Sequence, residues 1–147
     1  MPLLTIAILA LNPRFSYRME IHYERVLPLF FSAIYYYIGY YLLRNLSIYP
    51  IFKVFLIASV LVIVVLLLIS FRWKISAHMA GIGSITGIIL AISFRMGVNP
   101  VFIIAGLFLV AGLVGSARLY LGKHNLLQIV SGYLMGLIIL FVSVYYV

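Results

Sequence analysis

Histidine and arginine side chains recur at three places in this sequence, each beside a long apolar run. Histidine exchanges protons near neutral pH and acts as a nucleophile, and arginine forms paired hydrogen bonds with phosphate or carboxylate oxygens. A pocket that holds both residue types has the parts for phosphoryl transfer without a metal. Arginines would neutralise the phosphoryl oxygens, one histidine would attack phosphorus, and another would protonate the leaving oxygen.

The first place is residues 12–28, NPRFSYRMEIHYERVLP. Helical spacings of 4, 4 and 3 put Arg14, Arg18, His22 and Arg25 on one face. A stripe of like charges is unfavourable unless an anion meets it, so this face suits phosphate or carboxylate. The alternative is a basic helix that rests on anionic lipid headgroups, and the stretch taken alone favours that interpretation.

The second place is residues 71–87, FRWKISAHMAGIGSITG. Ser76 is predicted to cap the helix that carries His78, which would turn backbone N–H groups toward an anion. The alternative is an interfacial anchor made by Trp73 and Lys74 beside an incidental histidine. Taken alone, this stretch favours the anchor.

The third place is residues 115–132, GSARLYLGKHNLLQIVSG. Arg118 closes one apolar run and His124 precedes the next, with Gly122 predicted to make the turn between them. Gln128 follows His124 by one helical turn, so its carbonyl oxygen is placed to accept a hydrogen bond from the ring and fix the tautomer. The alternative is a structural or lipid-contacting histidine at a membrane interface.

The elements that position these residues are predicted from composition. The 147 residues are 67% hydrophobic and 8% charged, whereas soluble domains carry about 25% charged residues. Because a membrane-spanning helix needs about 20 apolar residues, we predict an all-α, polytopic transmembrane helix bundle forming a single domain over 1–147. It has about five full spans and a short N-terminal apolar segment. The spans are predicted at 28–43, 51–71, 79–94, 100–117 and 126–147, and the short segment at 2–11.

Local signals refine these spans. Pro50 and Pro100 each stand at the start of an apolar run, where the missing N–H of proline is tolerated. Small residues four apart allow lipid-embedded helices to approach closely. The predicted pairs are Gly83 and Gly87, Ala111 and Gly115, and Gly132 and Gly136.

Composition and spacing also exclude several functions. The chain has no cysteine, which excludes disulfides and thiolate catalysis. Its basic stretches are too short to follow a nucleic acid backbone, so no nucleic acid partner is predicted. The histidines and glutamates show no metal-ligand spacing, so no metal or other cofactor is predicted. A small transporter or channel subunit ranks last, because the spans hold few polar residues.

Alternating crossings would gather the polar residues on one membrane face. The connections near 12–27, 72–78 and 118–125 would share that face, with all three histidines, both glutamates and seven of the ten cations. The connections near 44–50 and 95–99 would lie on the other. We therefore predict that the three polar places converge on one pocket. The positive-inside rule would make the crowded face cytoplasmic, but arginines that bind substrate do not count toward it.

Three motifs occur in a fixed order: Arg18-x6-Arg25, Ile75-Ser76-Ala77-His78 and Arg118-x5-His124-x3-Gln128. Over residues 18–136 the chain thereby resembles the type-2 phosphatidic acid phosphatase superfamily, which also includes vanadium haloperoxidases. The family elements are Lys-x6-Arg-Pro, Pro-Ser-Gly-His and Ser-Arg-x5-His-x3-Asp. The third motif is the most specific of the three.

The resemblance implies hydrolysis of a lipid phosphate or diphosphate, such as phosphatidic acid, a polyprenyl diphosphate or phosphorylated lipid A. His124 would form a phosphohistidine and His78 would protonate the leaving group, without a metal. The resemblance also implies a multi-pass protein of a bacterial inner membrane, with its site on the extracytoplasmic side. The residues that it assigns to the phosphoryl oxygens are Arg18, Arg25, Arg118 and the Ser76 region.

Gln128 is the main departure, because the family has Asp where this chain has Gln. A carboxylate orients the nucleophilic histidine and stabilises its charged form, and the comparable Asp-to-Asn change in a serine-protease triad costs on the order of 10⁴ in rate. Two hypotheses therefore stay open: an active phosphatase, or an impaired homologue that binds a phosphorylated lipid without turnover. The short segment at 2–11 suggests a truncated family helix, which a homo-oligomer would complete, or else a fragment.

Overall fold

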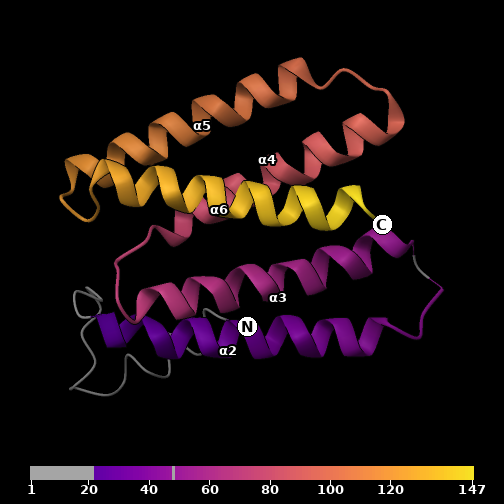
Figure 1. Ribbon diagram of the computed structural model, residues 1–147, viewed down its shortest axis with the longest axis horizontal. Helices are drawn as coiled ribbons and strands as arrows, with labels where there is room; N and C mark the ends of the chain where they lie inside the picture. Colours follow the sequence, from indigo (N-terminus) through magenta and orange to yellow (C-terminus); the bar gives the residue numbers. More distant parts are fainter. Residues whose placement is uncertain (1–21, 48) are drawn as a thin grey trace.

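The computed structural model describes residues 22–47 and 49–147, which form five helices and no strand (Figure 1). The side chains of residues 22–25 and 27 are not described. The predicted segment at 2–11 and the predicted ligand-binding residue Arg18 lie outside the described residues. The helices are α2 (His22–Leu43), α3 (Pro50–Ser70), α4 (Ala77–Met96), α5 (Val101–Tyr120) and α6 (Leu126–Tyr145).

Four of these helices, α3 to α6, are long and apolar enough to cross a membrane. The chain is therefore an all-helical, multi-pass integral membrane protein. Within the described residues α2 has 22 residues but is not one of the four, so a fifth crossing stays a prediction. The four spans begin and end within three residues of the predicted bounds.

Local signals mark several helix boundaries correctly. Pro50 is the first residue of α3, and Pro100 immediately precedes α5, where its carbonyl oxygen accepts a hydrogen bond from the N–H of Ile104. The membrane span predicted at 28–43 lies within α2, whose described residues begin at His22, so Pro28 is inside the helix. An apolar run marks where a chain can enter lipid, and the helical backbone continues beyond it through polar residues.

The helices form an open row in the order α2, α3, α6, α4, α5 (Figure 1). Consecutive helices run in opposite directions. The start of α2 and the connections 71–76 and 121–125 therefore share one end of the row, which we call the histidine end. The connections 44–49 and 97–100 and the end of α6 lie at the opposite end. The predicted segregation of connections is confirmed for the described residues.

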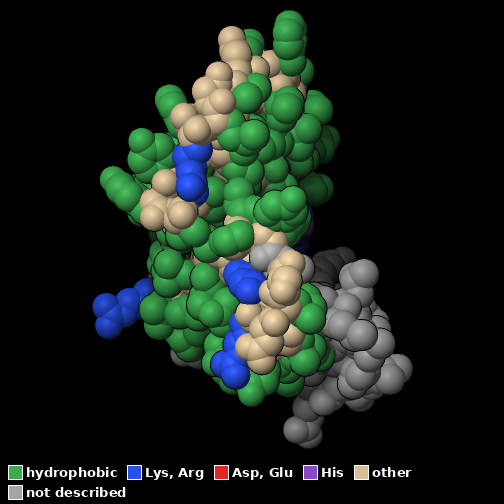
Figure 2. Space-filling model, turned by 90° about the vertical axis from the view of Figure 1, so that its right-hand side faces the viewer, with side chains coloured by type: hydrophobic (Ala, Val, Ile, Leu, Met, Phe, Trp, Pro, Cys, Tyr) green, Lys and Arg blue, Asp and Glu red, His purple; other side chains and the backbone are tan. Residues whose placement is uncertain are grey.

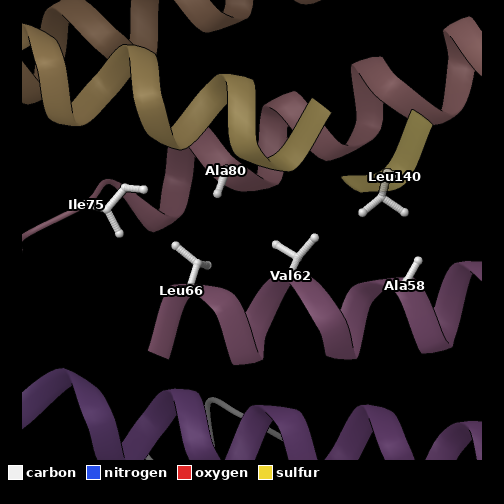
Figure 3. Close-up of a cluster of buried hydrophobic side chains, with 6 residues drawn as sticks. All are labelled: Ala58, Val62, Leu66, Ile75, Ala80 and Leu140. Atoms are coloured by element: carbon white, nitrogen blue, oxygen red, sulfur yellow. The ribbon is translucent and has the colours of Figure 1, made fainter. Parts of the chain in front are cut away.

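A stripe of apolar residues on α3 faces α6 and the start of α4 (Figure 3). Residues four apart on a helix share one face, which explains the stripe. This contact packs α3 against α6 at the centre of the row. It also holds the end of α3 beside the start of α4, which the connection 71–76 joins to it. The buried cluster comprises Ala58, Val62 and Leu66 on α3, with Ile75, Ala80 and Leu140 opposite.

Helices α4 and α6 approach until their backbones touch. A Cβ atom added at Gly132 would lie 2.6 Å from the carbonyl oxygen of Ser76. At the other three interface glycines, the added Cβ would collide with a carbonyl oxygen of the facing helix. The predicted close packing is confirmed, because only glycine fits here. The four glycines are Gly83 and Gly87 on α4 and Gly132 and Gly136 on α6.

The predicted pair on α5 packs less tightly. Ala111 and Gly115 are buried, and a Cβ at Gly115 would lie 3.4 Å from the side chain of Ile129, which is close to ordinary contact. Helix α5 is otherwise the most exposed of the four spans. It therefore flanks the α4 and α6 pair, and Arg118 in its last turn reaches the histidine end.

Candidate functional site

His124 stands immediately before α6, with 8% of its surface exposed. Its Nδ1 lies 3.1 Å from the backbone oxygen of Lys74 and 3.1 Å from Oε1 of Gln128. The predicted contact between His124 and Gln128 is therefore confirmed. The Lys74 oxygen adds a second partner, from a connection 50 residues away in the chain.

The orientation of the Gln128 amide follows from its other contact. Gln128 and Asn125 form a capping box at the start of α6: the N–H of Asn125 donates to Oε1 at 3.2 Å, and the N–H of Gln128 donates to Oδ1 at 2.9 Å. Because Oε1 accepts from a backbone N–H, the amide oxygen must be the atom that faces His124.

These acceptors set the tautomer of His124. The two described acceptors beside Nδ1 are carbonyl oxygens, which only accept hydrogen bonds, so Nδ1 carries the proton in these contacts. In the neutral ring the lone pair then belongs to Nε2. A histidine held in this way presents Nε2 as the nucleophilic or proton-accepting atom.

Two of the three predicted polar places are joined by hydrogen bonds. Besides the Lys74 contact, the N–H of Ser76 donates to the backbone oxygen of Gln128 at 3.2 Å. Two hydrogen bonds therefore join the connection 74–76 to residues 124–128. Close packing at Gly132, directly against Ser76, holds the same junction one turn further along α6.

Ser76 is the N-cap of α4, as predicted. Its hydroxyl accepts a hydrogen bond from the N–H of Met79 at 3.5 Å, and the residue is fully buried. Its side chain therefore organises the helix start from inside the interface. His78, the second residue of α4, is exposed at the same end. Since α4 and α6 begin side by side, the positive ends of two helix dipoles meet there.

The arginines reach the histidine end to different extents. Arg118 is half-buried in the last turn of α5, and its backbone oxygen accepts from the N–H of Lys123 at 3.1 Å. The predicted turn at Gly122 is confirmed, with a φ of 60°. Arg25 lies in the first turn of α2 at this end, but its side chain is outside the described set, as is all of Arg18.

Asn125 and the Lys74 carbonyl were missed by the sequence analysis. Asn125 had a signal, because Asn-Leu-Leu-Gln before an apolar run is the pattern of a capping box. The Lys74 carbonyl had none, since a backbone oxygen leaves no mark on residue type. In the part of the chain that the structure describes, no three histidine or acidic side chains gather to hold a metal ion.

The arrangement can bind an anion and present a nucleophile. Arg118, His78 and the starts of two helices supply positive charge and N–H donors at one end. His124 supplies a lone pair on Nε2, because two carbonyl oxygens accept the proton of Nδ1. No protein-family model, curated protein or solved structure matches this chain.

Proposed function

We propose that the chain is a metal-independent membrane phosphatase that hydrolyses a lipid phosphate or diphosphate, with His124 as the nucleophile. The observation that carries the proposal is the pair of 3.1 Å contacts that hold the proton of His124 on Nδ1. A nucleophilic histidine needs an unprotonated ring nitrogen and a fixed orientation, and these contacts supply both. Sequence motifs at His78 and Arg118 support the same reaction.

In the proposed reaction Nε2 of His124 attacks phosphorus and the bond from phosphorus to the ester oxygen breaks. The leaving oxygen takes a proton from His78, which yields a phosphohistidine and a free lipid alcohol, or a lipid monophosphate where the substrate is a diphosphate. Water then attacks phosphorus, His78 takes a proton from this water, and the bond to Nε2 breaks. Inorganic phosphate leaves, and His124 returns to its neutral form.

Positive charge at the histidine end would stabilise the phosphoryl oxygens. Arg118 lies at this end, and the proposal adds Arg25 and Arg18 from the motif that precedes it. The starts of α4 and α6 contribute their dipoles, which favour an anion by roughly 0.3–1 kcal/mol each at exposed sites. Ser76 supports this arrangement by capping α4.

The proposal also includes the membrane setting. Helix α2 would make a fifth crossing, and a second copy of the chain would complete the bundle. The site would open on the extracytoplasmic side of a bacterial inner membrane, where lipid phosphates arrive within the bilayer. The substrate then reaches the histidine end from the membrane without leaving the lipid.

Binding without turnover is the second candidate function. It is favoured by the neutral amide of Gln128, which cannot stabilise a charged imidazole as a carboxylate would. Its oxygen is also shared with the N–H of Asn125. In this version the same pocket holds a phosphorylated lipid, and His124 serves as a hydrogen-bond partner to the phosphate.

Phosphate release tests the proposal. Purified protein in detergent, with a chelator present, is expected to release inorganic phosphate from phosphatidic acid, a polyprenyl diphosphate or phosphorylated lipid A. His124→Ala should lower the rate by at least about a thousandfold, because it removes the nucleophile. Arg44→Gln, which removes a cation at the opposite end, should leave the rate unchanged.

The same preparations separate the two candidate functions. Each lipid is also titrated against the protein in a binding assay. Binding that depends on Arg118, without phosphate release by wild type, would favour the binding protein. If wild type and His124→Ala release equally little phosphate and neither binds any of these lipids, both candidate functions are wrong.

A further inference from the structure

A pocket lies at the opposite end of the row from His124. It has a volume of about 400 Å³ and is formed by the start of α3, the end of α4 and the end of α6. Its walls are apolar, including Val54, Ile92 and Val144, and Arg95 is the one charged residue that lines it. Its volume falls within the range of roughly 300–1,000 Å³ usual for small-molecule sites.

Arg95 is held at this pocket by a specific contact. It lies in the last turn of α4, and its guanidinium donates to the backbone oxygen of Val144 at 3.1 Å. A guanidinium has several N–H donors in a fixed plane, so one contact orients the group and leaves others to meet an anion. The residue is exposed, which keeps those donors accessible.

The charge around the pocket is one-sided. The sequence has two acidic residues: Glu24 lies in the first turn of α2, at the other end, and Glu20 lies outside the described residues. Figure 2 looks onto the opposite end: on its described part Lys and Arg patches lie among apolar side chains, and no Asp or Glu is visible. Among the described residues that line the pocket, none has an acidic side chain that would compete for Arg95.

The other two cations of this end are engaged elsewhere. Nζ of Lys53 donates to the backbone oxygen of Arg44 at 2.7 Å, and the Arg44 guanidinium lies 4.0 Å from the centre of the Tyr41 ring. Neither residue lines the pocket. Of the three described cations at this end, Arg95 is the one that lines the cavity. Arg44, which lies at the same end outside the cavity, provides a matched control.

The ligand must combine an apolar body with an anionic group. Because the pocket opens at the ends of three apolar helices, it lies at the level where lipid headgroups meet hydrocarbon. We propose that this pocket is a binding site for an anionic membrane lipid, with one acyl chain in the cavity and the headgroup phosphate on Arg95. This site is separate from the proposed phosphatase site and does not depend on it.

Native mass spectrometry of the full chain in detergent tests the proposal, with phosphatidylglycerol and phosphatidylcholine as probes. Wild type is expected to retain phosphatidylglycerol preferentially. Arg95→Gln should weaken its affinity about tenfold, the loss expected for one charge-assisted hydrogen bond. It should affect phosphatidylcholine less, because the choline cation of that headgroup already balances the phosphate. Arg95→Lys should retain most of the affinity, and Arg44→Gln should change nothing. Val54→Phe, which fills the cavity, should lower binding with Arg95 intact.

Four outcomes would overturn this proposal. Equal losses in Arg95→Gln and Arg44→Gln would indicate a general basic surface. Equal retention of both lipids would indicate an apolar groove without anion selection. Glycerol phosphate binding as tightly as the lipid, with the same dependence on Arg95, would indicate a site for soluble anions. An Arg95-dependent dimer without bound lipid would make a second copy the occupant. Melting temperatures of all variants show whether they are folded.

Discussion

One oxygen atom, Oε1 of Gln128, serves two structures at the histidine end. It accepts a hydrogen bond from the backbone N–H of Asn125, which caps the start of α6, and another from the ring of His124. The backbone contact keeps the oxygen in place, so the ring meets a pre-positioned acceptor. The two contacts therefore orient His124 without a carboxylate. Among the described contacts, a positively charged ring would be stabilised only by the dipoles of two neutral carbonyl groups, those of Gln128 and Lys74.

Gln128→Glu is expected to raise the rate of phosphate release about tenfold or more, because a carboxylate of equal length keeps both contacts and stabilises the charged ring that forms in the reaction. Phosphate release measured from pH 5 to pH 9 checks this, a range that brackets the pKa of roughly 6.5 of free imidazole.

Asn125→Ala is the control for this variant. It breaks the capping box and should lower stability by about 1 kcal/mol, yet it leaves the His124 contact with Gln128 intact, so phosphate release should not change. A rate that falls in step with stability in both variants would mean that Gln128 matters only as a helix cap.

At the scale of the elements, the contact between α4 and α6 organises the histidine end. The glycines bring the start of α4 against the first turns of α6, where Ser76 meets Gln128 and Gly132. Two non-consecutive helices thus begin at nearly the same point. A small shift between them would separate the Lys74 oxygen from His124 and leave the contact with Gln128.

Gly83→Ala tests this contact. Its added methyl group would collide with the carbonyl oxygen of Tyr133, so we expect a loss of about 1–3 kcal/mol in stability, as for other overpacked interfaces. Gly81→Ala on the same helix meets nothing within 4 Å and should be neutral or stabilising by up to about 1 kcal/mol from helix propensity. Thermal unfolding in detergent measures both. Similar melting temperatures for the two variants would contradict the tight contact.

The sequence predicted features whose signals are local. The spans, the cap at Ser76, the turn at Gly122 and the contact of His124 with Gln128 all follow from residues within one helical turn or one apolar run. Helix α2 continues through Pro28 into polar residues, beyond the apolar run from which the span at 28–43 was predicted.

The order of the helices in the row could not be predicted, and neither could the Lys74 contact. Both depend on which apolar faces meet, and most spans are apolar on every side. The glycine pairs showed that helices would pack closely without showing that α4 would pair with α6. Convergence of the first polar place, around Arg18 and Arg25, with the other two stays a prediction.

At the scale of the molecule, the row divides into two chemically different ends. One end holds His78 and His124 with the starts of α4 and α6. The other holds Arg44, Lys53 and Arg95, and no acidic residue whose position the structure describes. A substrate phosphate and a headgroup phosphate would therefore bind at opposite membrane faces. This polarity is a direct result of the alternating direction of the helices.

Single cysteines test this polarity against a background that lacks native cysteine. In oriented vesicles, Arg72→Cys and Leu121→Cys should react with a membrane-impermeant maleimide from one side. Asn45→Cys and Asn99→Cys should react from the other, since all four positions are exposed in connections at the two ends. Labelling of position 72 and position 121 from different sides would refute the arrangement of the row.

The pairing of α4 with α6 has a consequence for synthesis of the chain. Helix α4 is the least apolar of the four spans, and its main partner emerges only after α5 has been made. During that interval α4 sits in the bilayer with its glycine face uncovered. Insertion of α6 therefore completes this pair, and a ribosome that stalls before Leu126 would leave an intermediate open to quality-control proteases.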